Sequence, residues 1–200
     1  MTPAIASTAS TAIARQGSSN SQPTSSIMIG PRPTVINVEP MKFLIMDAPR
    51  QQNLGLYIKE MKKHGVTDMV RVCEPTTYTS GELVNAGIYL HEMPYEDGHA
   101  PPQQIIDQWL KLVEKSFFKM DEAPTQKKCI AIHCVAGLGR APAMVALALI
   151  EFSNMDPVEA VTLIRKYRQG AINEKQLTYL EGYKRSFKRS GGEAACCVIL

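Results

Sequence analysis

Short apolar runs alternate along the chain with longer stretches in which apolar residues recur at helical spacing. Five runs have the length and apolar character of buried strands. Their residues are 34–38, 41–46, 66–73, 88–93 and 129–133. Gly65 and Pro94 lie at the limits of two of these runs and act as natural breaks.

Apolar positions three or four residues apart predict helices, each with one buried face. The stretches are 54–61, 106–117, 143–152, 157–167 and 177–183. Asp156-Pro157, with Glu159 following, is a typical helix start: an N-cap acid, a proline in the first turn and a second acid. Strands that alternate with helices predict an α/β fold, with a central, mainly parallel sheet flanked by helices on both faces. In such folds the functional site lies at the carboxyl ends of the central strands.

Composition divides the 200 residues into three parts. Residues 1–33 are rich in Ser, Thr and Ala and contain no acidic residue, so we expect a disordered extension rather than a secretory signal. Residues 34–187 are long enough to bury one substantial core and form the predicted domain. Residues 188–200 are the predicted C-terminal tail.

Charge and cysteine content narrow the class of protein. A net charge of +3 is too small to indicate nucleic-acid binding. The five cysteines form no regular framework of spacings, which indicates a reducing compartment. The four histidines lack metal-ligand spacing with any cysteine, and we expect no metal and no cofactor. No apolar run approaches the ~20 residues of a membrane span.

The segment His133-Cys134-Val135-Ala136-Gly137-Leu138-Gly139-Arg140 follows the predicted strand 129–133. A tight loop that opens a helix presents free backbone N–H groups and the positive end of the helix dipole, which together bind anions. The same field favours the thiolate form of Cys134, which makes it a nucleophile. Arg140 offers a planar pair of donors that matches two phosphate oxygens. The phosphate-binding residues are therefore predicted to be Val135, Ala136, Gly137, Leu138, Gly139 and Arg140.

This Cys-x5-Arg pattern is the signature of cysteine-based protein phosphatases. Three further segments accompany it: residues 70–74 (Val-Arg-Val-Cys-Glu), residues 94–102 (Pro-Tyr-Glu-Asp-Gly-His-Ala-Pro-Pro) and a cysteine-containing C-terminus. In this combination, residues 34–200 resemble the phosphatases of regenerating liver, the type IVA protein tyrosine phosphatases. The resemblance implies a compact fold like that of the dual-specificity phosphatases and hydrolysis of phosphoproteins through a cysteinyl-phosphate intermediate.

The resemblance also assigns roles to individual residues. Asp97 occupies the general-acid position of the family, in a loop whose Gly98 suits a surface flap; the neighbouring Glu96 is the alternative acid. Cys73 matches a family cysteine that forms a disulfide with the nucleophile, here Cys134. Taken alone, a cysteine that ends a buried strand is most often a small core residue, and this interpretation is the alternative.

Ala141 occupies the position where most relatives of this loop have Ser or Thr, whose hydroxyl stabilises the departing thiolate. We therefore expect slow hydrolysis of the phosphoenzyme. Weak catalysis opens an alternative, in which the pocket mainly binds a partner, as family members bind CBS-pair magnesium transporters. A second alternative is an inositol-lipid phosphatase, although the uncharged Val135, Ala136 and Leu138 offer no lysine to additional ring phosphates. The sequence leaves open whether the protein forms a homo-oligomer.

The chain ends in Cys197-Val198-Ile199-Leu200, a prenylation box whose final leucine favours geranylgeranyl, whereas the family is more often farnesylated. A single prenyl chain anchors weakly and needs a second signal. Basic residues before the box supply attraction to an anionic membrane surface. We therefore expect the protein at the cytoplasmic face of the plasma membrane or of endosomal membranes, with a fraction in the cytosol. The basic residues are Lys184, Arg185, Lys188 and Arg189.

Overall fold

A mixed sheet forms the centre of the computed structural model, which describes residue 1 and residues 29–75, 78–119 and 128–188. Within these residues the sheet has five strands in the order β1-β2-β5-β3-β4. Only β1 and β2 pair antiparallel, and the other neighbours are parallel. The strands are β1 (Thr34–Val38), β2 (Met41–Met46), β3 (Val66–Arg71), β4 (Tyr89–Glu92) and β5 (Cys129–His133).

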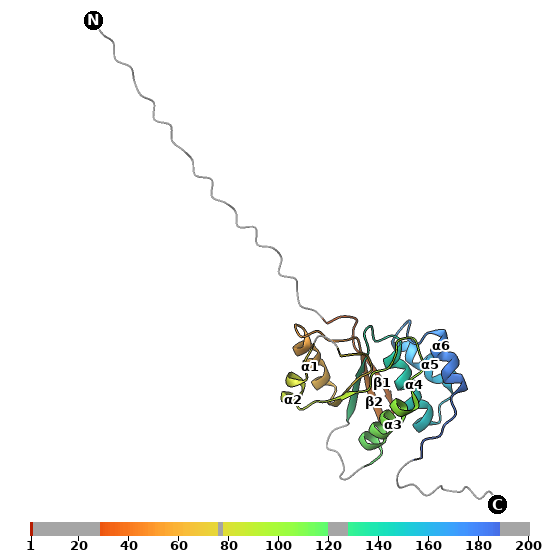
Figure 1. Ribbon diagram of the computed structural model, residues 1–200. Coiled ribbons are helices and arrows are strands. Elements are labelled where there is room, and N and C mark those ends of the chain that lie inside the picture. Colours follow the sequence, from red (N-terminus) through yellow and green to blue (C-terminus); the bar gives the residue numbers. More distant parts are fainter. Residues whose placement is uncertain (2–28, 76–77, 120–127, 189–200) are drawn as a thin grey trace, which may run out of the picture.

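Helices cover both faces of this sheet (Figure 1). Helices α1 and α2 pack on one face, and α3 to α6 lie on the other. The helices are α1 (Leu54–Lys63), α2 (Gly81–Asn85), α3 (Gln103–Phe117), α4 (Arg140–Ser153), α5 (Pro157–Tyr167) and α6 (Glu174–Gly182). This arrangement confirms the predicted α/β class with a mainly parallel, helix-flanked sheet.

Strand β5 and helix α4 form the buried axis of the molecule. All five residues of β5 are buried because β2 and β3 pair on either side of it. Its side chains alternate between the faces: Ile130 and Ile132 join the core under α3 to α6, while Cys129 and Ala131 join the core under α1 and α2. Helix α4 is buried from Arg140 through Ile150 and has no polar face over that length. The loop between the two elements is therefore anchored at both ends in buried structure.

One aromatic contact joins α3 to α4 and β2. Trp109 is fully buried, and its indole Nε1 donates a hydrogen bond to the Met144 carbonyl at 2.7 Å. Its ring centroid lies 5.6 Å from that of Phe43. The bond satisfies the single polar atom of a large apolar side chain, which is the usual condition for burying tryptophan.

The strands agree with the apolar runs, and the helices agree less closely at their ends. Helix α4 begins at Arg140, three residues before the predicted start, because the loop passes directly into the first helical turn. Helix α6 begins at Glu174 because Asn173 and Gln176 form a capping box. Helix α2 was not predicted, since five residues give too little periodicity. The Asp156 N-cap is confirmed: its side chain accepts a hydrogen bond from the Val158 N–H at 2.9 Å.

The described chain contacts the domain before the predicted boundary at Thr34. The Gly30 N–H donates to the Tyr57 hydroxyl at 3.1 Å, and the Tyr57 hydroxyl donates to Asp47 at 2.7 Å. At the other end, the prenylation box lies outside the described residues. Among the described helices, none combines the length and the apolar character needed to cross a lipid bilayer.

Candidate active site

The predicted phosphate loop lies where the carboxyl end of β5 meets the first turn of α4. Strand β5 ends at His133, Cys134 follows with only 3% of its surface exposed, and α4 starts at Arg140. The end of β3 lies beside the end of β5, because Arg71 is in register with His133. The structure therefore brings together the motif segment and the segment around Cys73, although Cys73 and Cys134 are 61 residues apart in the sequence.

Carbonyl groups of the loop bond to the surrounding protein. The carbonyl of Val135 accepts from the Ala48 N–H at 3.0 Å, and that of Leu138 accepts from the Ile172 N–H at 2.7 Å. In a trans peptide the C=O and the following N–H point in opposite directions. The N–H groups that follow these carbonyls therefore point to the opposite side of the loop. Successive N–H groups arranged in this way form a concave anion site, here at a helix N-terminus.

The two central carbonyls of the loop, those of Ala136 and Gly137, accept hydrogen bonds from Arg168 at 3.4 and 2.5 Å. Gly137 has φ of +68°, a left-handed conformation that costs other residues about 1–2 kcal/mol. A Cβ at this position would also collide with the carbonyl oxygen of Met46 and with Nη2 of Arg168. The loop thus requires glycine here for two independent reasons.

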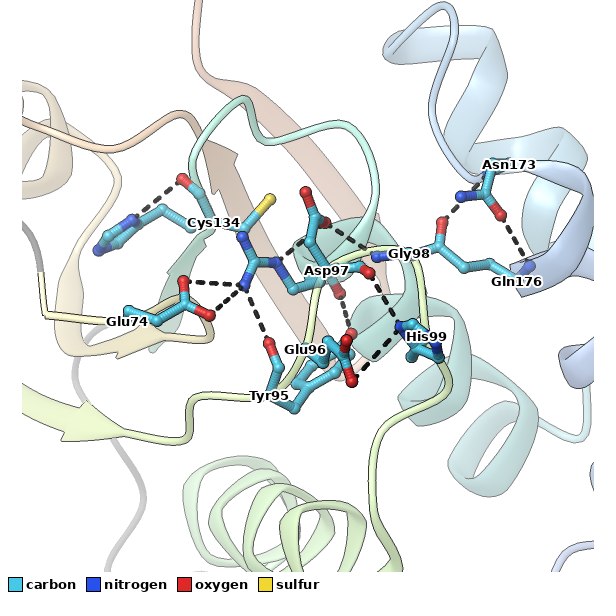
Figure 2. A network of polar contacts seen from close by, with 11 residues as sticks. Glu74, Tyr95, Glu96, Asp97, Gly98, His99, Cys134, Asn173 and Gln176 are labelled. Atoms are coloured by element: carbon cyan, nitrogen blue, oxygen red, sulfur yellow. Dashed lines mark hydrogen bonds and ion pairs between the residues drawn. The ribbon is translucent and has the colours of Figure 1, made fainter.

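Arg140 is 2% exposed and lies among carbonyl and carboxylate oxygens of Glu74, Tyr95 and Asp97, three residues that Figure 2 labels. Its Nη1 donates to the Tyr95 carbonyl at 2.9 Å and lies 3.3 Å from a carboxylate oxygen of Glu74. Its Nε lies 3.1 Å from Oδ1 of Asp97 in an ion pair. In turn, the Tyr95 hydroxyl donates to the Arg140 carbonyl at 3.0 Å. The guanidinium is therefore fixed from two sides, and its orientation does not depend on a ligand.

Asp97 and Glu96 occupy different positions, although they are adjacent in an exposed loop. Asp97 reaches Arg140, which lies at the other end of the loop that begins at Cys134. The Glu96 carboxylate instead lies 3.7 Å from His99, with 79% of the side chain exposed. His99 also donates from Nδ1 to the Asp97 carbonyl at 3.0 Å, which ties the loop together. Geometry thus favours Asp97 as the acid near the nucleophile, and its catalytic role stays a prediction.

His133 is buried and neutral at neutral pH. Burial lowers its pKa to about 4, with a smaller contribution from the positive charge of Arg71. The Tyr78 hydroxyl donates to its Nε2 at 2.7 Å, and its Nδ1 donates to the Cys134 carbonyl at 3.3 Å. The positive charge near Cys134 therefore comes from arginine and not from an imidazolium ion.

Cys73 lies on the strand-end next to that of Cys134. The Val72 N–H donates to the His133 carbonyl at 3.0 Å, so the chain continues alongside β5 for one residue beyond β3. By the same register Val72 lies opposite Cys134, and Cys73 is one residue further along; both cysteine side chains join the same buried core. Both thiols are free here, and burial raises the pKa of Cys73 to about 11. Cys73 is only 1% exposed, so it is also a residue of the hydrophobic core, as the alternative interpretation expects.

Sequence reasoning assigned no role to Glu74, Tyr78 or Arg168, which contact Arg140, His133 and the loop carbonyls. Arg168 follows an amphipathic helix at a position where a solvent-exposed base is common, so the sequence carries no signal that it is buried. Glu74 is directly adjacent to Cys73 in a segment already singled out, which was a usable signal. Among the described residues, no group of three or more His, Cys, Asp or Glu is arranged to hold a metal ion.

Comparison with known proteins identifies the family of this chain. A family model described as "PTP-SAK: Swiss Army Knife protein, DSP-PTPase phosphatase domain" matches residues 33–179. The human protein tyrosine phosphatase type IVA 3 is 47% identical over 154 residues, which are 77% of this chain and 85% of the human protein. The PRL-1 phosphatase of Drosophila melanogaster is 45% identical over 171 residues, 84% of this chain and 93% of the relative.

The chain belongs to the type IVA protein tyrosine phosphatases. A solved structure of a protein tyrosine phosphatase from Leishmania major agrees with this, with 42% identity and a TM-score of 0.70. The match covers 76% of this chain and 99% of the Leishmania chain. The family resemblance of the sequence motifs is therefore confirmed over most of the described domain.

Gly137→Ala is predicted to lower kcat/KM for an aryl phosphate by about 10²-fold, because the loop must move to relieve the collision with Met46 and Arg168. Steady-state kinetics measures this loss. Gly87→Ala is the matched control: Gly87 has φ of +76°, and a Cβ there meets nothing within 4 Å. Both substitutions strain the backbone, but only the first is expected to affect kcat/KM. Equal losses in the two variants would refute the special requirement at Gly137.

Proposed function

We propose that this type IVA phosphatase hydrolyses phosphate monoesters of phosphoproteins, phosphotyrosine above all, through a cysteinyl-phosphate intermediate. The observation that carries the proposal is the loop itself, whose carbonyls bond outward while Cys134 and Arg140 flank its N–H groups. Curated relatives at 45–47% identity are named as protein tyrosine phosphatases or as a phosphatase, which supports the same reaction.

In the first step the Cys134 thiolate attacks phosphorus. The S–P bond forms as the bond from phosphorus to the substrate oxygen breaks, and Asp97 donates its proton to that leaving oxygen. The loop N–H groups and Arg140 bind the three other phosphate oxygens, where charge accumulates. In the second step Asp97 takes a proton from water, the water oxygen attacks phosphorus, and the thiolate departs. Inorganic phosphate and the original protonation states result.

The second step is expected to be slow, because Ala141 has no hydroxyl to donate to the departing sulfur. The Ala141 side chain is fully buried, so solvent does not replace that hydroxyl. Binding of a partner in the same pocket is the second candidate function. It is favoured by the exposure of two apolar side chains of the loop, Val135 at 58% and Leu138 at 40%. A CBS-pair magnesium transporter is the partner class that the family resemblance suggests.

Cys134→Ser is predicted to abolish turnover of an aryl phosphate and leave the fold intact, because a hydroxyl stays protonated at pH values where the thiol ionises. Kinetics under strong reductant, with a thermal melting curve for each protein, measures both effects. Cys129→Ser is the control, since Cys129 is also buried but begins the same strand at its other end. Turnover near that of the unmutated protein in Cys134→Ser would refute the proposed reaction.

The same assay distinguishes the two loop acids and the two functions. Asp97→Ala should lose about 10²-fold in kcat, and Glu96→Ala should lose little, because only Asp97 reaches Arg140. The reverse result would identify Glu96, and not Asp97, as the acid. Should the unmutated protein prove inactive, with Cys134→Ser changing nothing, partner binding would replace catalysis as the function.

We further propose that Cys73 protects the nucleophile through a disulfide. Hydrogen peroxide would oxidise the Cys134 thiolate to a sulfenic acid with release of hydroxide. The Cys73 thiol would then displace water from the sulfenic sulfur and form the disulfide. The hydrogen bond from Val72 to His133 supports the pairing, because it keeps the two chain segments side by side. Burial holds Cys73 as an unreactive thiol until that stage.

Cys73→Ser is predicted to make peroxide inactivation harder to reverse with dithiothreitol, since an unpaired sulfenic acid proceeds to sulfinic acid. The measurement is the activity recovered after a fixed peroxide exposure, with Cys129→Ser as control. Peptide mapping of the oxidised, unmutated protein should find Cys73 joined to Cys134. Cys134 joined only to Cys129 or only to glutathione would contradict the pairing.

We also propose that a prenyl group on Cys197 anchors the protein to the cytoplasmic face of the plasma membrane or of endosomes, with a fraction in the cytosol. Cys197 lies outside the described residues. The support comes from the sequence box and from Lys184, Arg185 and Lys188, which are exposed at the end of the described chain. Two such signals, one lipid and one electrostatic, are the usual requirement for stable anchoring.

Cys197→Ser is predicted to move most of the protein from the membrane fraction to the cytosol, because only Cys197 has three residues after it. Fractionation of cells, together with labelling by a prenyl analogue, measures the effect. Cys196→Ser is the matched control and should keep the label. A Cys197→Ser protein that stays membrane-bound at high salt would show that something other than the lipid and surface charge holds it there.

A further inference from the structure

Arg168 is a buried arginine that the proposed reaction does not use. It follows the last residue of α5 and is 5% exposed. Its hydrogen bonds all go to neutral acceptors, three backbone carbonyls and one hydroxyl. Burying an arginine is costly unless its donors are satisfied, so a position like this calls for a physical reason.

Two of those bonds fix the centre of the phosphate loop. Nε donates to the Gly137 carbonyl at 2.5 Å, and Nη2 lies 3.4 Å from the Ala136 carbonyl. Each carbonyl is rigidly coupled to the N–H of the next residue, which points the opposite way. Holding these two carbonyls toward Arg168 therefore turns the N–H groups of Gly137 and Leu138 away from it, toward the concave side of the loop.

The other bonds tie the guanidinium to the edge of the sheet. Nη1 donates to the Arg32 carbonyl at 3.2 Å and to the Thr34 hydroxyl at 3.0 Å. Thr34 is the first residue of β1. Arg168 is therefore held independently of the loop, and the loop is positioned against a fixed group. A donor that is itself immobile is what precise positioning requires.

The charge of Arg168 also lies very close to the loop backbone. No side chain stands between them, since a Cβ on Gly137 would be only 2.6 Å from Nη2. Burial lowers the pKa of Arg168, while Asp47 and Cys134 act in the opposite direction. The positive charge of Arg168 would attract a phosphate dianion from behind the loop, where solvent screens little.

We propose that Arg168 is a positioning residue for the phosphate loop, which orients the N–H groups of Gly137 and Leu138 toward the bound phosphate and supplies a positive charge behind them. The inference rests on the proposed function only in that the loop binds a phosphate group. It does not require that Cys134 attack it, so the two can fail separately.

The test measures the binding of inorganic phosphate by calorimetry in the full-length Cys134→Ser protein, where no turnover occurs. Arg168→Gln removes both the charge and the forked donors and should weaken phosphate binding by about 10²-fold. Arg168→Lys keeps the charge but loses the fork, and about a tenfold loss is expected. With Cys134 restored, each variant should raise KM for an aryl phosphate by about the factor by which it weakens phosphate binding.

Two neighbours on α5 provide matched controls. Lys166→Gln removes one positive charge from the last turn of α5, and Lys166 is exposed. Arg165→Lys repeats the second substitution at an arginine whose donors go to the carbonyls of Ala171 and Ile172, outside the loop. Neither control should change the phosphate Kd by more than about twofold, a shift typical of an exposed charge.

A merely structural role for Arg168 would lower the melting temperature and the active fraction, and so kcat, but leave KM and the phosphate Kd unchanged. That result, in folded Arg168→Lys or Arg168→Gln protein, would overturn the proposal. So would equal losses of phosphate affinity in the two controls. If Arg168→Gln does not fold, the comparison of Arg168→Lys with Arg165→Lys decides by itself.

Discussion

Peptide planarity in the loop after β5 is the constraint on which the rest of the site depends. The carbonyls of residues 135–138 accept hydrogen bonds from the surrounding protein, so the N–H groups of the following residues have a single direction left. An anion site made of backbone groups gains its strength from such prior orientation, because nothing has to reorganise when charge develops. Cys134, the predicted nucleophile, and Arg140 lie at the two ends of a loop that the fold has already shaped.

The supports of this loop come from all parts of the domain. Ala48 follows β2, Arg168 follows α5, and Ile172 precedes α6. Glu74, from the segment after β3, and Asp97 contact Arg140. Because β5 is the middle strand, the segments that follow its neighbours β2 and β3 end near the loop. The parallel order of the sheet thus explains why residues distant in sequence meet there.

The strand runs could be predicted from the sequence because each has a local pattern, whereas the catalytic roles of Cys134, Arg140 and Asp97 stay predictions. Cys134 and Arg140 have fixed spacing in one segment, and Asp97 lies in a recognisable loop. Arg168 could not be predicted in this way. Its role depends on burial and on partners in residues 32–34 and 136–137, which only the folded chain brings together. Helix α2 could not be predicted for a different reason: in five residues the apolar positions are too few to show helical periodicity.

The proposed reaction requires covalent chemistry at Cys134, and trapping the intermediate would reveal it. The full-length protein is mixed with an aryl phosphate and quenched in acid within milliseconds, and its peptides are analysed by mass spectrometry. One phosphoryl group is expected on the peptide that contains Cys134, with substantial occupancy in steady state because Ala141 leaves its hydrolysis slow. Turnover with no phosphoryl group on Cys134 at any quench time, or with the group on another residue, would contradict the proposed reaction.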